Sequence, residues 1–135
     1  MNYIRNAIYY LPVILLIMLL SCTSEPTRSM EVTATAYNSL KAQTANDPAI
    51  TAWGDSLEPG MKAIAISRDL LDSGFYHELE VSIDGLDGTY KVLDKMNRRW
   101  TKKIDIYMGV NEAKAREWGK QEVTIRWTPV DWVNG

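Results

Sequence analysis

The feature that most constrains the fold is a series of short segments in which apolar and polar side chains alternate. Residues 78–85 read ELEVSIDG, with Leu79, Val81 and Ile83 on one side of the chain. A period of two places alternate side chains on opposite faces of a β-strand, and β-branched residues favour strands. Related patterns recur in residues 31–37, 62–67, 88–94, 102–107 and 121–127. Six short strands of this kind predict a mainly β chain that forms a small barrel.

Two other segments have the signals of helices. Residues 111–119 begin with Asn111, which is favoured at a helix N-cap, and end with Gly119, which is favoured just after a helix. Residues 68–74 can form one helical turn closed by Gly74. The glycines of GLDG, residues 85–88, predict a hairpin between the flanking strands. We therefore expect a six-stranded barrel with one or two short helices and a surface loop at residues 38–48.

The N-terminal residues have the pattern of a secretory signal. A single charge, Arg5, precedes the apolar residues 8–20, a run that is short for a transmembrane helix of roughly 20 residues. The run ends in LLSC, which resembles the bacterial lipobox, in which the cysteine becomes the lipidated first residue of the mature chain. Acyl chains on Cys22 would anchor the protein to a membrane. Thr23 follows the cysteine, at a position where an aspartate would favour retention in the inner membrane of many Gram-negative cells, so we expect the outer membrane, facing the periplasm.

These boundaries divide the chain into four parts. We expect a lipoprotein signal peptide at residues 1–21 and the lipidated cysteine with a polar tether at residues 22–30. The barrel domain then occupies residues 31–127, and a C-terminal tail occupies residues 128–135.

Composition excludes several classes of function. Without residues 1–21 the chain keeps 14 basic and 17 acidic side chains, which gives a net charge of −3 with His77 neutral. This acidic balance does not indicate a protein that binds nucleic acid. One cysteine and one histidine provide neither a disulfide framework nor a thiolate or imidazole metal site. No glycine-rich phosphate loop is present. His77 is expected at the surface, and we expect no metal or cofactor, so enzymatic chemistry would have to depend on carboxylates.

Three aspartates lie at or near the predicted strands. Asp69 follows IAISR, Asp94 ends YKVLD, and Asp105 lies inside KIDIY. Each alone is typical of a solvated or capping residue. Together with VTATAY, ITAWGD, PGMKAIAISRD, GTYKVLDKM and REWGKQEVTI, they resemble the three-aspartate (3D) domain family over residues 32–126. The barrel of that family is also the catalytic barrel of membrane-bound lytic transglycosylase A. The resemblance implies a double-psi β-barrel and assigns the family aspartates to these three positions.

The resemblance also implies an activity on peptidoglycan. Lytic transglycosylases break the bond between N-acetylmuramic acid and N-acetylglucosamine without water, because the muramyl 6-hydroxyl attacks its own anomeric carbon and leaves a 1,6-anhydro ring. One carboxyl group can act first as acid and then as base, since proximity replaces the second carboxylate of ordinary glycosidases. That group must start protonated, which burial or nearby negative charge favours. The resemblance points to Asp105, with Asp94 and Asp69 as candidates for the nearby charge.

Several further residues are candidates for binding glycan strands. Aromatic rings can stack on sugars, although Trp53 and Trp100 can equally pack on the barrel. The candidates are Tyr37, Thr51 beside Ala52 in the turn TAWGD, Trp53, Trp100 and Lys103.

One segment departs from the family pattern. Many members have a glycine-rich segment after the second aspartate, whereas residues 94–100 read DKMNRRW and are bulky and basic. This basic cluster can meet the carboxylates of peptide stems or can simply be a solvated loop. Its members are Lys95, Arg98, Arg99, Lys102 and Lys103.

The expected protein is a monomeric, lipid-anchored member of the bacterial cell envelope that cleaves peptidoglycan glycan strands. One alternative is a lipoprotein of the same fold that binds peptidoglycan or organises the envelope without cleavage. Another is an accessory barrel that binds a protein partner through its tail. Convergence of the three aspartates in one open groove would favour the enzyme, and burial of Asp105 beneath residues 97–100 would count against it.

Overall fold

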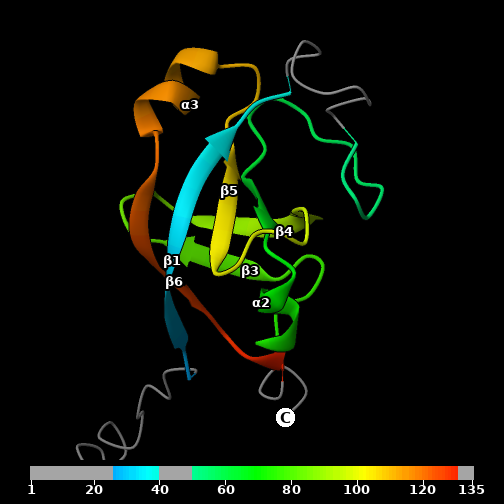
Figure 1. The fold of residues 1–135 in the computed structure, drawn as a ribbon, viewed down its shortest axis with the longest axis vertical. Helices are drawn as coiled ribbons and strands as arrows, with labels where there is room; N and C mark the ends of the chain where they lie inside the picture. Colours follow the sequence, from blue (N-terminus) through cyan, green and yellow to red (C-terminus); the bar gives the residue numbers. More distant parts are fainter. Residues whose placement is uncertain (1–25, 40–49, 131–135) are drawn as a thin grey trace, which may run out of the picture.

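The structure, a computed structural model, describes residues 26–39 and 50–130. The elements in chain order are β1 (Arg28–Tyr37), β2 (Ala63–Ile66), α2 (Asp69–Asp72), β3 (Glu80–Ile83), β4 (Thr89–Lys95), β5 (Lys103–Tyr107), α3 (Glu112–Trp118) and β6 (Gln121–Trp127). The strands form a closed barrel in the order β1-β5-β2-β4-β3-β6 (Figure 1). The prediction of a mainly β, six-stranded barrel with short helices is therefore confirmed. The predicted signal peptide and Cys22 lie outside the described residues, as do residues 40–49 and the tail from 131 onward.

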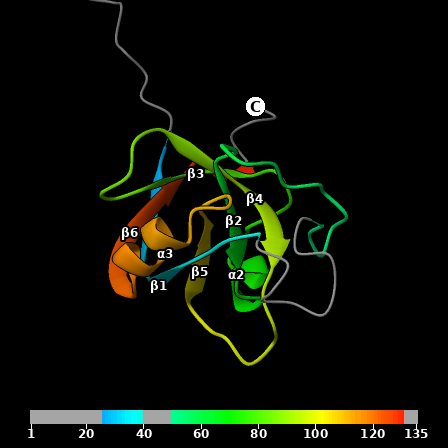
Figure 2. The same cartoon turned by 90° about the horizontal axis from the view of Figure 1, so that it is seen from above.

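The barrel is mixed in strand direction (Figure 2). The pairs β1–β5 and β2–β4 are parallel, whereas the other four pairs are antiparallel. The predicted hairpin across residues 85–88 is present as the antiparallel pair β3–β4. β1 begins at Arg28, three residues before the predicted strand, and pairs there with Trp127 of β6. The last residues of the expected tether thus belong to the barrel.

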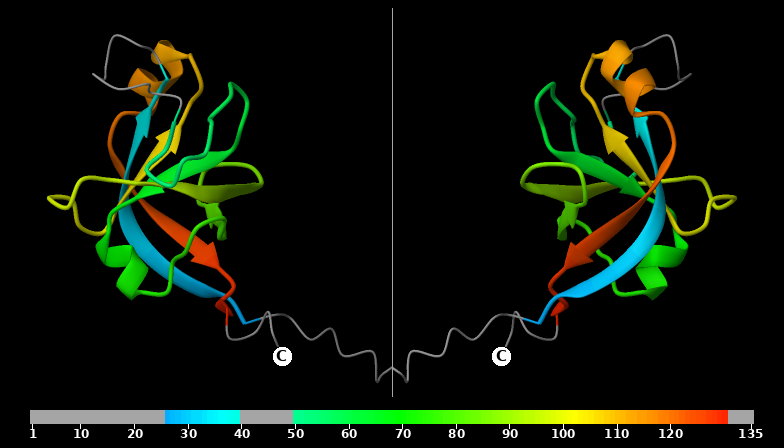
Figure 3. Two further views of the ribbon diagram at one scale, coloured as in Figure 1. Left: turned by 90° about the vertical axis from the view of Figure 1, so that its right-hand side faces the viewer. Right: turned by 90° about the vertical axis from the view of Figure 1, so that its left-hand side faces the viewer.

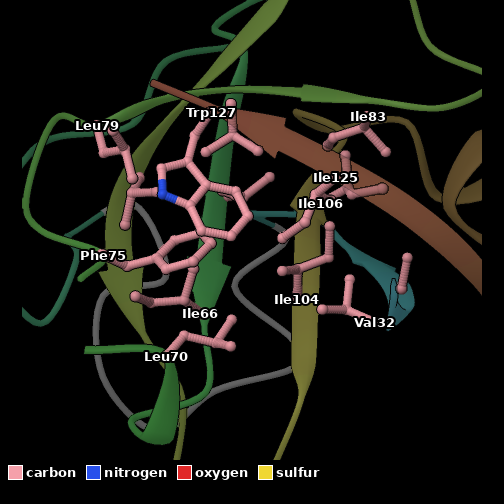
Figure 4. Close-up of a cluster of buried hydrophobic side chains, with 14 of the residues drawn as sticks. Val32, Ile66, Leu70, Phe75, Leu79, Ile83, Ile104, Ile106, Ile125 and Trp127 are labelled. Carbon is pink, nitrogen blue, oxygen red and sulfur yellow. The ribbon is translucent and has the colours of Figure 1, made fainter. Parts of the chain in front are cut away.

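The barrel interior is filled by the apolar side chains of the alternating segments (Figure 4). Ile64 and Ile66, predicted to share one face of their strand, are both fully buried. The rings of Phe75 and Trp127 pack together with their centroids 4.5 Å apart. Because side chains alternate along a strand, the residues between these core positions face outwards. The outer surface of the barrel is therefore where polar side chains of the strands gather.

Both helices are short and end as the sequence predicts. The Asn111 side chain caps α3 by accepting the backbone N–H of Lys114 at 2.9 Å, and Gly119 ends the helix with φ = 64°. Gly74 follows α2 with φ = 91°. The helix α3 lies beside the end of β1 (Figure 1). No helix in residues 26–39 and 50–130 is both long and apolar enough to cross a membrane.

The connection between β4 and β5, residues 96–102, projects from the side of the barrel (Figure 3). Its N-terminal end is held where the Met96 N–H donates to the Ile66 carbonyl at 2.8 Å. Its tip is a turn in which the Trp100 N–H donates to the Asn97 carbonyl at 3.1 Å. Beyond this turn, the Trp100 ring lies beside Lys103 of β5, whose Nζ atom is 3.7 Å from the ring centroid.

Candidate functional site

Four side chains form a row across four neighbouring strands on the outer face of the barrel. Thr35 of β1 pairs with Asp105 of β5, which pairs with Ala65 of β2, which in turn pairs with Asp94 of β4. Directly paired residues project from the same face of a sheet. Two strand spacings of about 4.8 Å separate the aspartates, so their Cα atoms are about 10 Å apart. The small side chain of Ala65 lies between the two carboxyl groups.

A β-bulge brings Asp94 to this face. Along β4 the register with β2 runs Ile64↔Val92 and then Ala65↔Asp94, so one residue, Leu93, is extra. In a regular strand, Asp94 would share a face with Val92, which is fully buried in the core. The extra residue re-aims the side chain, a known effect of bulges beside functional sites. Asp94 is partly exposed as a result.

The two aspartates line a groove of about 300 Å³. This volume is at the lower end of the range of roughly 300–1,000 Å³ for small-molecule sites. Ala65 lies at the middle of the row, the end of β1 forms one wall, and the β4–β5 connection forms the other. The lining residues are Tyr37, Asn38, Ala65, Asp94, Lys95, Met96, Asn97, Trp100 and Asp105.

The environment of Asp105 favours its protonated form. Burial raises the pKa of Asp105 above its usual range, and the negative charge of Asp94 adds to this effect. The Thr35 hydroxyl donates to Asp105 Oδ1 at 2.9 Å, and it opposes the rise together with the charge of Lys103. No described residue hydrogen-bonds to Oδ2. One oxygen of Asp105 is therefore held by Thr35, and the other is available to a ligand in the groove.

Asp94 is held rigidly by backbone donors. Its Oδ1 atom accepts the Ala52 N–H at 2.7 Å and the N–H of Lys95 at 2.8 Å. The bond to Ala52 ties the turn at residues 51–55 to the edge of the groove. Asp94 thus keeps one position and presents a carboxylate to the groove beside Asp105.

Tyr37 places a hydroxyl near both carboxyl groups. Burial raises the pKa of Tyr37, and the charges of Asp94 and Asp105 raise it further. The hydroxyl is buried and has no hydrogen-bond partner among the described residues. Since an unpaired buried hydroxyl is costly, a ligand that accepts a hydrogen bond from this O–H would stabilise the site. Tyr37 was a predicted binding residue and lines the groove.

Asp69 lies outside the groove lining, unlike the other two predicted aspartates. Its Oδ2 atom accepts the backbone N–H of Lys102 at 2.9 Å, where Lys102 has a positive φ of 44°. Partial burial favours the neutral acid, but the neighbouring Ser67 hydroxyl and the Lys102 N–H outweigh it and lower the pKa of Asp69. The position of Asp69 is that of a residue that holds the base of the β4–β5 connection.

We expect Asp69→Ala to lower the free energy of unfolding by about 1 kcal/mol, because one hydrogen bond is lost and the unusual backbone of Lys102 loses its support. Asp69→Asn keeps an oxygen acceptor and should lose less. Urea denaturation of the two variants measures the difference. If the alanine variant unfolds at the wild-type midpoint, Asp69 does not hold this connection.

The turn at residues 51–55 is internally bonded and does not line the groove. Thr51 is buried, and its hydroxyl donates to Asp55 Oδ2 at 3.1 Å. His77 Nε2 also contacts Asp55 Oδ2, at 2.8 Å, so His77 has more than the plain surface role expected. The rings of Trp53 and His77 pack together with their centroids 5.1 Å apart. The Nζ atom of Lys95 lies 4.6 Å from the centroid of the Trp53 ring. Thr51 and Trp53 support the turn that holds Asp94, and their binding of substrate stays a prediction.

Trp100 and Lys103, the remaining predicted binding residues, lie together. Lys103 Nζ is 3.7 Å from the Trp100 ring centroid, and Arg99 Cζ is 4.9 Å from it. Trp100 lines the groove and keeps 36% of its surface exposed. Lys103 does not line the groove, but its charge acts on Asp105.

Sequence reasoning missed Thr35 and Ala65. Both belong to segments already identified as strands, and Thr35 is two residues from Tyr37. Only the pairing of the strands identifies them as neighbours of the aspartates, so strand patterns alone did not reveal them.

Comparison with known proteins adds no relative: no protein-family model matches the chain, and neither does any curated protein. Among residues 26–39 and 50–130, no group of three or more His, Cys, Asp or Glu side chains is placed to hold a metal ion.

Proposed function

We propose that this protein is a lipid-anchored cell-envelope protein that cleaves peptidoglycan glycan strands by a lytic transglycosylase mechanism. The observation that supports this proposal most directly is the partly buried Asp105, whose pKa is raised, beside Asp94 in a groove. The resemblance to the three-aspartate domain family supplies the substrate. Anchoring through Cys22, in the outer membrane facing the periplasm, belongs to the same proposal.

The proposed reaction uses one carboxyl group twice. Protonated Asp105 donates its proton to the glycosidic oxygen as the bond to the anomeric carbon of N-acetylmuramic acid breaks. The carboxylate then accepts the proton of the muramyl 6-hydroxyl while that oxygen bonds to the anomeric carbon, which closes the 1,6-anhydro ring and regenerates the acid. Burial suits the first step because it keeps the proton on Asp105 at a higher pH than usual.

The neighbouring groups have supporting roles in this proposal. Asp94 favours the protonated form of Asp105 and can stabilise positive charge that develops on the sugar ring. The unpaired hydroxyl of Tyr37 can donate to a sugar oxygen. The exposed part of the Trp100 ring offers an apolar surface to a pyranose.

The decisive experiment is digestion of purified peptidoglycan by the mature protein, followed by mass spectrometry. The proposal requires products that carry 1,6-anhydromuramyl ends. Products with reducing ends would indicate hydrolysis by water instead. Absence of any product, with the strands still bound, would favour the non-catalytic alternative.

The pH dependence of cleavage tests the role of Asp105. Since the acid must be protonated, the rate should fall as pH rises through the raised pKa of Asp105. The hydrogen bond from Thr35 stabilises the carboxylate, so Thr35→Val should raise this pKa further and move the falling limb of the pH–rate profile to higher pH. Thr124→Val, on β6 outside the groove lining, is the control and should leave the limb in place. A limb that shifts equally in both variants would contradict the assignment.

A non-catalytic peptidoglycan-binding protein is the alternative that one observation favours. Only two of the three family aspartates meet in the groove, because Asp69 is engaged with the backbone of Lys102. Binding of strands needs the groove, Tyr37 and Trp100, but not a proton donor. In that case the wild type would bind strands without releasing any product, and Asp105→Asn would bind them equally well.

A further inference from the structure

A second cavity of about 300 Å³ shares Trp100 with the groove. Its cationic members come from three places in the chain: Arg99 from the β4–β5 connection, Lys103 from β5, and Lys120 from the turn before β6. None of its lining residues is acidic. The full lining is Thr33, Arg99, Trp100, Thr101, Lys103 and Lys120.

None of the three cations of this cavity forms an ion pair with a described residue, although the charge of Lys103 also acts on Asp105 in the groove. The ion pairs of the described chain join His77 to Asp55, Arg116 to Glu112, and Arg126 to Asp84, and none involves the cavity. The Thr33 hydroxyl donates to Glu122 Oε1 at 2.7 Å, so this carboxylate is bonded to a hydroxyl instead of a cation. Gathering three like charges is unfavourable, and an anion in the cavity would relieve the repulsion.

The Trp100 ring holds two of these charges in place. Lys103 Nζ and Arg99 Cζ lie 3.7 Å and 4.9 Å from its centroid, distances at which a cation is attracted to an indole ring. The side chains are therefore positioned before any ligand arrives, which lowers the entropic cost of binding. The guanidinium of Arg99 can form a two-pronged bond with a carboxylate.

We propose that this cavity binds the carboxylate groups of the peptide stems that branch from a glycan strand. The proposal rests on the proposed function, because it takes the glycan strand to lie in the groove. Trp100 forms a wall of both sites, so a sugar in the groove and the stem attached to it can occupy the two sides of one ring. The protein then prefers strands that carry peptides over bare strands.

Binding can be measured without any cleavage. The probe is a synthetic stem peptide with free carboxylates, titrated into the full mature chain while the Trp100 indole N–H signal is followed by NMR, with Trp100→Phe used for assignment. The double variant Arg99→Gln/Lys120→Gln should weaken binding by about fivefold for each cation removed. Lys114→Gln on α3 makes a single charge change outside the cavity and should bind as the wild type does. Thermal melts confirm that both variants fold.

Three controls address the chemistry of the ligand. The same peptide with its carboxylates amidated should bind much more weakly, and added salt should weaken the unmodified peptide because exposed charges are screened. Inorganic phosphate that binds as tightly as the peptide would show a general anion site and would overturn the proposal. Equal binding by the wild type and the double variant would overturn it as well.

Cleavage of two substrates separates this inference from the proposed function. Strands that carry stems should be cleaved faster than strands stripped by an amidase, and the double variant should reduce this ratio. If both substrates are cleaved at equal rates and the peptide leaves the Trp100 signal unchanged, the cavity inference fails while the proposed function stands. If neither substrate is cleaved, but the peptide binds to the wild type and not to the double variant, the proposed function fails while the cavity inference stands.

Discussion

Asp105→Asn is expected to reduce the release of 1,6-anhydromuramyl products by at least about 100-fold, because a single positioned acid–base group contributes typically about 10²- to 10⁴-fold. The substitution preserves the shape of the side chain, and asparagine Oδ1 can still accept the hydrogen bond from Thr35. The ability to donate and then accept the catalytic proton is what is removed. The rate of product formation on purified peptidoglycan, measured by mass spectrometry, checks the result.

The same variant has an expected signature in stability. The folded-state pKa of Asp105 is raised, so its contribution to stability is fully present below the unfolded value of about 3.9 and is lost as pH rises through the folded pKa. Asparagine does not ionise and escapes this loss. The melting temperature of Asp105→Asn, relative to the wild type, should therefore improve as pH rises from about 3.9 to the folded pKa of Asp105, and the difference should stay constant above it.

The two measurements together identify the role of Asp105. A loss of activity with an equal or higher melting temperature at neutral pH indicates a residue that is retained for chemistry at a cost in stability. Asp72→Asn, an exposed position on α2, is the matched control and should change neither property. A folded Asp105→Asn protein with undiminished activity would exclude the proposed mechanism.

The orientation of Asp105 could be predicted because it depends on local pattern alone. Ile104 and Ile106 are fully buried, as the alternation requires, and this turns Asp105 to the outer face. The hairpin, the cap at Asn111 and the six individual strands follow equally from short-range signals. Each is set by residues within one segment or two adjacent ones.

The position of Asp94 could not be predicted in the same way. Its place beside Asp105 depends on the bulge at Leu93 and on β2 lying between β4 and β5. The alternation of apolar and polar residues predicts neither the bulge nor the order of strands in the barrel, because both depend on pairing between distant segments. The same holds for Asp69, whose role as an anchor for Lys102 depends on a backbone 33 positions away in the sequence.

The strand order that places Asp94 also makes Ala65 the position on which the groove depends. Ala65 pairs with Asp105 on one side and with Asp94 on the other, and it lines the groove. A larger side chain here would project between the two carboxyl groups. Since the groove holds only about 300 Å³, a branched side chain would take up space that a sugar ring requires.

Ala65→Leu is therefore expected to lower the rate of strand cleavage by about 100-fold or more, since displacing a substrate by about 1 Å can by itself cost about 10²-fold. Binding of strands in a pull-down should fall in parallel, which distinguishes this variant from Asp105→Asn. Ala65→Gly is the matched control: glycine weakens a strand by roughly 0.5–1 kcal/mol but leaves the groove open. If the leucine and glycine variants lose activity to the same extent, the loss reflects a weakened β2, and the groove is not the substrate site. If leucine alone removes both binding and cleavage while its melting temperature stays close to that of the glycine variant, the substrate lies between Asp94 and Asp105.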